Sequence, residues 1–233
     1  MIQVVCWKWN NGIHPKKNIL FTAKHVNALQ AMVARNLKIE HEFVCITDDP
    51  IGINESVRTI PLWDDYRAMG GCYVRLKAFS KEMASLIGPR FIWLDLDCVI
   101  TGDITHLVTQ AKDFKMWGDT NPFTPYNGSM VLMNAGSRSQ VWTQFNPSSS
   151  PDLAKSLRYV GRDQAWIGAC LGPNEDKWTI EDGVYSYRMH IRKRESTMPL
   201  PPGARIVFFH GSTDPSQPAI QAKLPWVAQH WRI

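Results

Sequence analysis

The first half of the chain alternates short apolar runs with segments of helical periodicity. Residues 4–7, 43–46 and 91–94 are continuous apolar runs of strand length. Between them, apolar side chains recur at helical spacing, first at Val26, Leu29, Val33 and Leu37 and then at Leu76, Phe79, Met83 and Leu86. This β-α-β-α-β order predicts an α/β fold with a mostly parallel central sheet flanked by helices on both faces.

Polar side chains follow the apolar runs where strands of such a sheet would end. Asp48 and Asp49 follow the second run, and Asp95 and Asp97 follow the third. Residues 130–133 and 205–209 are further strand candidates, and the latter ends at His210. Because open α/β sheets bind ligands at the carboxyl ends of their strands, these residues are the first candidates for a functional site.

Composition indicates one folded domain over residues 1–233 with a sizeable core, since 44% of residues are hydrophobic and 20% are charged. The net charge of +5 suits anionic ligands such as nucleotide phosphates, and would also suit nucleic acid. A basic cluster lacks the interleaved aromatic residues of nucleic-acid modules, so we expect a solvated loop, with docking of the acceptor or of phosphate as the alternative, and no nucleic-acid partner. The cluster comprises Arg188, His190, Arg192, Lys193 and Arg194.

Five cysteines are odd in number and widely spaced, which argues against a disulfide framework or a zinc site. Cys6, Cys45 and Cys98 fall in or beside apolar runs, where a free thiol acts as a small core residue. No apolar window is long enough to cross a bilayer, and the N-terminus has no basic leader or cleavage site. These features predict no membrane span and a cytoplasmic location.

The most informative segment is the apolar run 91–94 with the Asp95-Leu96-Asp97 sequence that follows it. Side chains two apart in extended geometry share a face, so both carboxylates can converge on one cation. Two carboxylates so close repel each other unless a cation or a proton lies between them, and Mg²⁺ and Mn²⁺ favour oxygen ligands. We therefore predict a divalent metal site; the plainer alternative is that one Asp caps a turn and the other is solvated.

A D-x-D sequence after a buried strand also opens phosphatases of the haloacid dehalogenase class. There Asp95 would be the nucleophile and Asp97 an acid/base. Gly118-Asp119-Thr120 faintly resembles the later metal motif of that class, but the downstream Asp is missing. This hypothesis is the minor one.

With the D-x-D sequence in place, nearly the whole chain resembles GT-A glycosyltransferases, most closely the glycogenin and bacterial galactosyltransferase group (glycosyltransferase family 8). The resemblance rests on ordered landmarks that contain the candidate residues. These are the strand ending at Asp48-Asp49, residues 71–79 with Arg75 and Lys77, the D-x-D sequence, residues 126–134 with Asn127 and Ser129, Asp163-Gln164, and the strand before His210.

The resemblance implies a Rossmann-like GT-A domain that transfers a sugar from a nucleotide-sugar, in particular a UDP-sugar, to an unidentified acceptor with retention of configuration. It implies Mn²⁺ or Mg²⁺ as cofactor, held by Asp95, Asp97 and His210. Asp163, Gln164 and Asn127 would be catalytic. The substrate-binding residues would be Asp48, Asp49, Arg75, Lys77, Asp95, Ser129 and Lys223.

One departure and several plainer alternatives accompany this assignment. The family pattern has a Lys shortly after the His-Gly pair. Here Asp214 stands near that position, and Lys223 lies farther along the chain. This departure leaves a catalytically silent nucleotide-sugar binder as an alternative. Arg75 and Lys77 would diverge by roughly 200° on a helix, and Arg75 is favoured because Arg binds phosphate bidentately. His210 could be a core histidine, Asp163 a helix N-cap, and Asn127 and Ser129 turn residues.

Overall fold

A computed structural model of the chain describes residues 1–9, 20–64, 69–118, 123–192 and 199–233. A seven-stranded sheet has the order β3-β2-β1-β4-β7-β6-β8. Its strands are β1 (Ile2–Lys8), β2 (His41–Thr47), β3 (Arg58–Pro61), β4 (Arg90–Leu94), β6 (Phe114–Gly118), β7 (Tyr126–Asn134) and β8 (Lys177–Trp178). The three apolar runs predicted as strands form β1, β2 and β4, so the α/β prediction is confirmed.

The sheet is mostly parallel, as its sequence pattern predicts. Strands β3, β2, β1 and β4 pair in parallel, and β6 pairs in parallel with β8. β7 runs antiparallel to both of its neighbours, β4 and β6. The carboxyl ends of the other six strands therefore share one edge of the sheet with the beginning of β7, which brings Asn127 and Ser129 to that edge.

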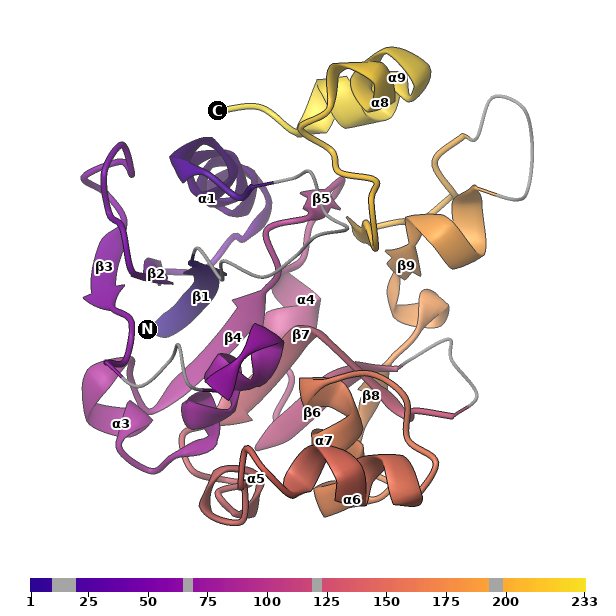
Figure 1. Cartoon of the computed structure of the whole chain (residues 1–233). Coiled ribbons are helices and arrows are strands. Elements are labelled where there is room, and N and C mark those ends of the chain that lie inside the picture. The colour runs from indigo at the N-terminus through magenta and orange to yellow at the C-terminus, as the bar shows by residue number, and fades with distance from the viewer. Residues whose placement is uncertain (10–19, 65–68, 119–122, 193–198) are drawn as a thin grey trace.

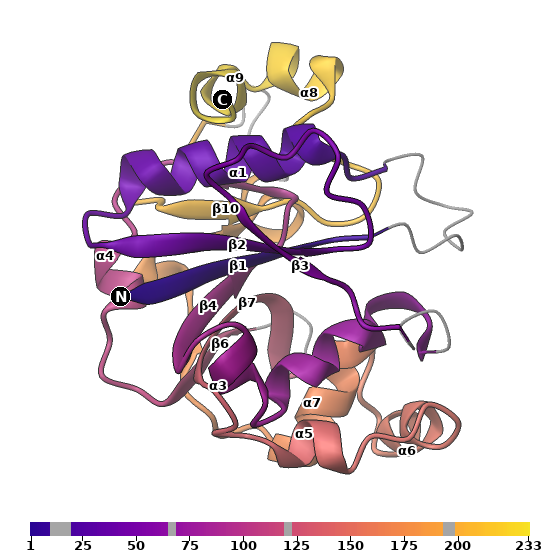
Figure 2. The same ribbon diagram turned by 90° about the vertical axis from the view of Figure 1, so that its left-hand side faces the viewer.

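Helices cover both faces of the sheet (Figures 1 and 2). One face carries α1 (Ala23–Asn36), and the opposite face carries η1 (Gly71–Phe79), α3 (Met83–Leu86) and α7 (Asp163–Leu171), with one apolar core on each side. The remaining helices are α4 (Thr105–Val108), α5 (Gln140–Thr143), α6 (Ser150–Ser156), η2 (Ile180–Asp182), η3 (Tyr187–Ile191), α8 (Pro218–Lys223) and α9 (Pro225–His230).

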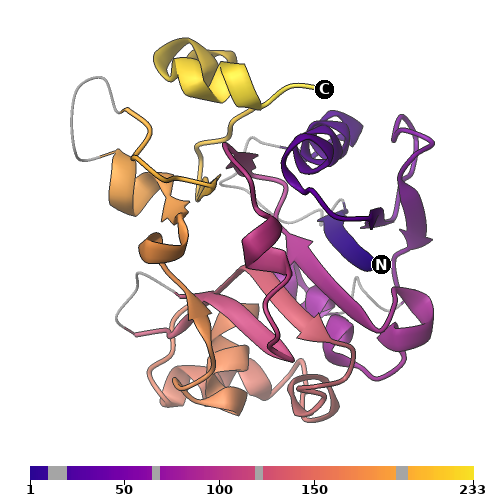
Figure 3. The same ribbon diagram turned by 180° about the vertical axis from the view of Figure 1, so that it is seen from behind.

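A second, three-stranded sheet has the order β5-β10-β9 and packs into the core on the α1 side. It consists of β5 (Cys98–Ile100), β9 (Val184–Ser186) and β10 (Ile206–Phe208), with β10 antiparallel to β5. The C-terminal helices lie beside α1 (Figure 3). Arg35 of α1 donates hydrogen bonds to the carbonyls of His230 and Arg232, both at 2.9 Å. The C-terminal segment therefore packs against α1.

Two expectations about helices need correction. The periodic segment 76–86 is not one helix, because a 3₁₀-helix, η1, ends at Phe79 and α3 begins at Met83. Asp163 is the first residue of α7 and not its N-cap, a position that Arg162 occupies. The Asp163 carboxylate hydrogen-bonds to Arg75 instead of to the helix backbone.

All five cysteines are free thiols, and Cys6, Cys45 and Cys98 are buried as expected. Burial raises the pKa of the Cys98 thiol well above its ordinary value, and the nearby carboxylates of Asp97 and Asp95 raise it further. The Cys98 thiol therefore stays protonated, and all three buried cysteines serve as small core residues. Among the helices of the described ranges, none combines the length and the apolar character that a bilayer crossing requires.

Candidate functional site

Backbone hydrogen bonds join the segment after β4 to the start of β7 and to the end of β10. The amide of Asp95 donates to the carbonyl of Ser129 at 2.9 Å, which joins the D-x-D sequence to β7. The amide of Phe209 donates to the carbonyl of Asp97 at 2.7 Å, which joins it to the end of β10. Three segments that the sequence analysis selected separately are therefore neighbours at one sheet edge.

Arg75 links two of the candidate carboxylates. Its Nη1 donates to Oδ1 of Asp95, and its Nη2 and Nε donate to Oδ2 of Asp163, the latter at 3.1 Å. The side chains of Arg75 and Asp163 are only 7% and 6% exposed, whereas Asp95 is 25% exposed. Burial alone would lower the pKa of Arg75, but the charges of Asp163 and Asp95 outweigh it and raise that pKa above its ordinary value. Arg75 is therefore a fixed cation between two carboxylates.

The β7 backbone packs closely against this cluster at Gly128. A Cβ atom built at this position would lie 3.0 Å from Nη2 of Arg75 and 3.1 Å from Oδ2 of Asp163. The Gly128 carbonyl accepts a 2.7 Å hydrogen bond from the indole of Trp93, whose ring lies 5.8 Å from the guanidinium carbon of Arg75. The absence of a side chain at Gly128 thus allows β7 to approach the ion pair of Arg75 and Asp163. The Trp93 ring packs near the guanidinium of Arg75 from the core side.

Asn127 and Ser129 flank this glycine. Oδ1 of Asn127 accepts a hydrogen bond from the amide of Ser129 at 2.9 Å, so its amide group is held by a local turn-like contact. Ser129 is 4% exposed and Asn127 is half-buried. The turn role considered for Asn127 is present, and it is compatible with a side chain that also contacts a ligand.

Gln164 follows Asp163 in the first turn of α7 and folds back over Gly161. A Cβ atom at Gly161 would lie 2.7 Å from Cγ of Gln164, and the positive φ of 122° at that glycine also excludes most other residues. The glycine before the helix therefore leaves room for the Gln164 side chain at the entrance of α7.

His210 follows β10 and is half-buried. Its ring stacks on that of Trp117, with centroids 5.4 Å apart and planes 15° apart. Among the described residues, no three His, Cys, Asp or Glu side chains gather as a metal-binding group, so the set of Asp95, Asp97 and His210 stays a prediction. The ring of Trp117 also stacks on that of Phe208, with centroids 4.9 Å apart and planes 27° apart.

Asp48 and Asp49 follow the end of β2, which is separated from β4 in the sheet by β1. Nζ of Lys8, at the end of β1, donates to the carbonyl of Asp49 at 2.5 Å and lies 3.4 Å from its carboxylate. The backbone amide of Ile51 and this lysine lower the pKa of Asp49. Asp48 borders a cavity of about 330 Å³, which is lined by Thr47, Asp48, Pro50, Thr59, Ile60, Pro61 and Leu62.

Lys8 is a site-edge residue that the sequence analysis missed. Its side chain is 7% exposed, although lysine is rarely buried. The available signal was a charged residue directly after the apolar run 4–7, the same signal that selected Asp48 and Asp95.

The two other candidate lysines do not join the Arg75 cluster in the same way. Nζ of Lys77 lies 5.1 Å from the ring of Trp63, whereas the guanidinium carbon of Arg75 lies 5.8 Å from the ring of Trp93. Lys223 is the exposed last residue of α8. Their roles in substrate binding remain predictions.

Asp214, which stands near the position expected for a basic residue, is part of the packing between the C-terminal loop and α1. Its carboxylate accepts a hydrogen bond from the amide of Ser216 at 2.8 Å and lies 3.4 Å from Nε2 of His25. Burial favours a raised pKa, but the bonds from His25 and Ser216 outweigh it and lower the pKa of Asp214. Asp214 is 1% exposed, so its role here is structural.

Some candidates from the sequence lie outside the described residues. These are Asp119 and Thr120 of the phosphatase-like motif and Lys193 and Arg194 of the basic cluster. Within the described part of that cluster, Arg188 and His190 belong to η3 and Arg192 follows it.

The sequence matches no family model and no curated protein. Its fold, however, resembles solved glycosyltransferases. A galactosyltransferase, LgtC, solved with donor and acceptor sugar analogues, is 11% identical, with 100% of this chain and 97% of that chain covered and a TM-score of 0.62. GlyE of Streptococcus pneumoniae TIGR4 is 12% identical over 99% of this chain and 62% of that chain, with a TM-score of 0.62.

Mouse xyloside xylosyltransferase 1 is a more distant match, 13% identical over 89% of this chain and 97% of that chain, with a TM-score of 0.52. At such low identities these likenesses concern the fold alone. They confirm that the chain has the GT-A glycosyltransferase fold that the ordered landmarks predict.

Proposed function

We propose that the chain is a metal-dependent glycosyltransferase that moves a sugar from a nucleotide-sugar, in the first instance a UDP-sugar, to an acceptor hydroxyl. The observation that carries the proposal is the Arg75 cluster. It unites Asp95 of the D-x-D sequence with Asp163 at the start of α7, at the sheet edge where α/β folds bind ligands. The GT-A fold supports the same reaction class.

The described residues fit a divalent cation through the two carboxylates of the D-x-D sequence. Arg75 occupies Oδ1 of Asp95, so Oδ2 is the atom that could meet a cation. Asp97 is 8% exposed and lies two residues after Asp95, between the end of β4 and the start of β5. Mg²⁺ commonly takes one or two carboxylates and completes its shell with water and substrate phosphates. A protein cage of three ligands is therefore not required, and His210 would be an additional ligand.

A bound cation would stabilise the negative charge that develops on the leaving nucleoside diphosphate. In the transfer, the bond between the anomeric carbon and the diphosphate oxygen breaks, and both electrons leave with the diphosphate. The acceptor oxygen bonds to that carbon, and its proton passes to the departing phosphate or to water.

The chain's own residues would act on the sugar. The anomeric carbon gains positive charge in an oxocarbenium-like transition state, by analogy with glycoside hydrolysis. Asp163 would act beside the sugar, with its carboxylate held by Arg75 through Oδ2. Gln164 and Asn127 would position its hydroxyl groups, Ser129 and Arg75 would hold the donor, and Asp48 and Asp49 would contact the nucleoside beside Lys8.

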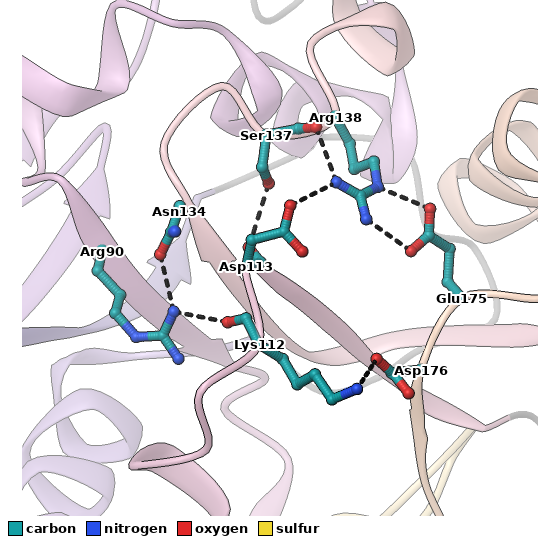
Figure 4. A network of polar contacts seen from close by, with 8 residues as sticks. All are labelled: Arg90, Lys112, Asp113, Asn134, Ser137, Arg138, Glu175 and Asp176. Atoms are coloured by element: carbon teal, nitrogen blue, oxygen red, sulfur yellow. Dashed lines mark hydrogen bonds and ion pairs between the residues drawn. The ribbon is translucent and has the colours of Figure 1, made fainter.

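The test is a titration of UDP with and without Mn²⁺, followed by incubation with UDP-sugars. We expect metal-dependent UDP binding and slow hydrolysis of one UDP-sugar. Asp97→Asn should abolish the metal-dependent binding while the variant still melts cooperatively. Asp176→Asn is the matched control, because Asp176 pairs with Lys112 on the surface at 2.9 Å, away from the D-x-D sequence (Figure 4).

Three other outcomes would change the proposal. Metal-dependent UDP binding without any turnover would favour the catalytically silent binder. Rapid hydrolysis of a phosphomonoester, with a trapped aspartyl-phosphate at Asp95, would favour the phosphohydrolase. Wild-type affinity for UDP and Mn²⁺ in Asp97→Asn would show that the metal site is wrongly assigned.

A further inference from the structure

A second cavity, of about 620 Å³, has none of the predicted donor or metal residues in its lining. Trp117 lines the cavity, stacks on His210, and pairs in the sheet with Asn127 of β7. Trp117 therefore contacts both the cavity and a predicted metal ligand.

The walls of the cavity are mainly apolar and stay exposed to solvent. Phe123, Leu157 and Ile180 are 60%, 52% and 43% exposed, and they line the same cavity. Large apolar side chains gathered around one hollow of this size are typical of small-molecule sites. The other lining residues are Trp117, Gly118, Thr124, Pro125, Arg158, Tyr159, Pro173, Lys177, Thr179 and His190.

The charged side chains of the described lining are all basic. Lys177 is held at the cavity by a 3.0 Å hydrogen bond from its Nζ to the carbonyl of Pro173. Nδ1 of His190 accepts a 2.9 Å hydrogen bond from the amide of Ser186, so a proton on the neutral ring sits on Nε2. The positive charges of Arg158 and Lys177 favour an anionic ligand with an apolar portion.

Arg158, at the end of α6, has an unusual backbone conformation. The amide of Tyr159 donates to the carbonyl of Ala154 at 3.1 Å, and the amide of Arg158 donates to that of Lys155 at 2.9 Å. This pair of bonds is the Schellman motif that ends α6, in which the residue at the Arg158 position is usually glycine. Arg158 has a φ of +67° and is the only non-glycine residue with positive φ in the described chain.

A side chain at a position that suits glycine costs stability, and here that side chain lines the cavity. Retention of stability-lowering residues is a common feature of binding sites. We propose that this cavity is the acceptor site and that it selects acceptor glycosides with a negatively charged substituent, which Arg158 binds. This inference rests on the proposed function.

Two probes that differ only in charge test the selectivity: 4-nitrophenyl β-D-glucuronide and 4-nitrophenyl β-D-glucoside, each titrated calorimetrically into the whole protein at low salt. We expect wild type to prefer the glucuronide by roughly tenfold, the effect of one charge-assisted hydrogen bond. Arg158→Gly should lose most of this preference and yet melt at a higher temperature, a combination that general damage to the fold cannot produce.

Two further variants separate charge from backbone strain. Arg158→Lys should keep part of the preference without the rise in melting temperature, because it retains both the charge and the strained conformation. Lys155→Gln, on exposed α6 outside the cavity lining, should behave as wild type in both measurements. An equal affinity for the two probes in wild type, or an undiminished preference in Arg158→Gly, would overturn the proposal.

The same proteins are also titrated with UDP and Mn²⁺, which distinguishes this inference from the proposed function. Unchanged UDP binding in Arg158→Gly supports an acceptor site separate from the donor site. Weakened UDP binding with an intact probe preference would mean that the cavity belongs to the donor, and the acceptor assignment would be wrong. If wild type binds no UDP but discriminates between the probes through Arg158, the transferase proposal fails and only the anionic-glycoside site stands.

Discussion

Two arginines in this molecule each bind two carboxylates, and they lie in contrasting environments. Arg75 bridges Asp95 and Asp163 with its side chain 7% exposed. Arg138 binds Glu175 through Nε and Nη2 at 2.6 and 2.8 Å, and its Nη1 donates to Asp113 at 2.9 Å (Figure 4). Its side chain is 20% exposed and that of Asp113 is 56% exposed.

The partners of each arginine explain the contrast. Arg138 is surrounded by contacts that connect strand ends and loops, including a 2.7 Å hydrogen bond between Arg90 and Asn134, the last residue of β7 (Figure 4). Arg75 instead holds carboxylates from the D-x-D sequence and α7. Both arginines therefore pair with two carboxylates, but the partly exposed Arg138 connects surface segments, whereas the buried Arg75 orders a candidate site. The difference between them lies in burial.

The largest effect is expected from Arg75→Met. Removal of this cation leaves Asp163 buried without a counter-charge, and breaking a buried pair in this way costs about 3–5 kcal/mol. Urea denaturation of the variant should show this loss in the free energy of unfolding. Arg75→Met combined with Asp163→Asn should recover much of it. A loss below about 1 kcal/mol would mean that the cluster is not held as tightly as its burial indicates.

A smaller effect is expected from Arg138→Met. Its pair with Glu175 is bidentate but partly solvated, so we expect a loss of about 1 kcal/mol in the free energy of unfolding. UDP binding in the presence of Mn²⁺ should be unchanged, whereas Arg75→Met should weaken it. Equal losses of UDP affinity in the two variants would remove the functional distinction between the two arginines.

The smallest effect concerns Asp113 and acid. The hydrogen bond from Arg138, against a smaller opposing effect of burial, lowers the pKa of Asp113 below its ordinary value of 3.8. A carboxylate with a lowered folded-state pKa stabilises the fold above pH 3.8 and loses that contribution as the pH falls further. The wild type should therefore exceed Asp113→Asn by less than about 1 kcal/mol at pH 6, and the difference should vanish toward pH 2. A difference that grows on acidification would contradict this sign.

Much of the fold follows from local patterns that the sequence displays openly. The apolar runs that form β1, β2 and β4 and the helical periodicity of α1 appear at their predicted places. The short strands β3, β5, β6, β8 and β9 were missed, because two to five residues carry too little periodicity to stand out. The break between η1 and α3 was missed for a related reason, since apolar spacing continues across it.

For the candidate site, the sequence selected Arg75, Asp95 and Asp163 from separate segments but did not pair them. The contact between Arg75 and Asp163 spans 88 residues, and no local preference encodes it. Lys8, Trp117 and Arg158 were missed as site-edge residues. Arg158 in particular is an ordinary surface arginine in the sequence, and only its φ of +67° reveals its unusual position.

The sequence by itself determined the fold class and the D-x-D element, because periodicity and the step from apolar to polar residues are local properties. The tertiary structure decided which charges meet: Arg75 pairs with Asp163, and Asp214 pairs with His25. It also decided where the large cavity lies relative to Trp117. The charge pairs and the position of the cavity depend on the order of the strands and on the antiparallel direction of β7. Both features bring together residues that are distant in the sequence, and they determine how deeply each charged side chain is buried.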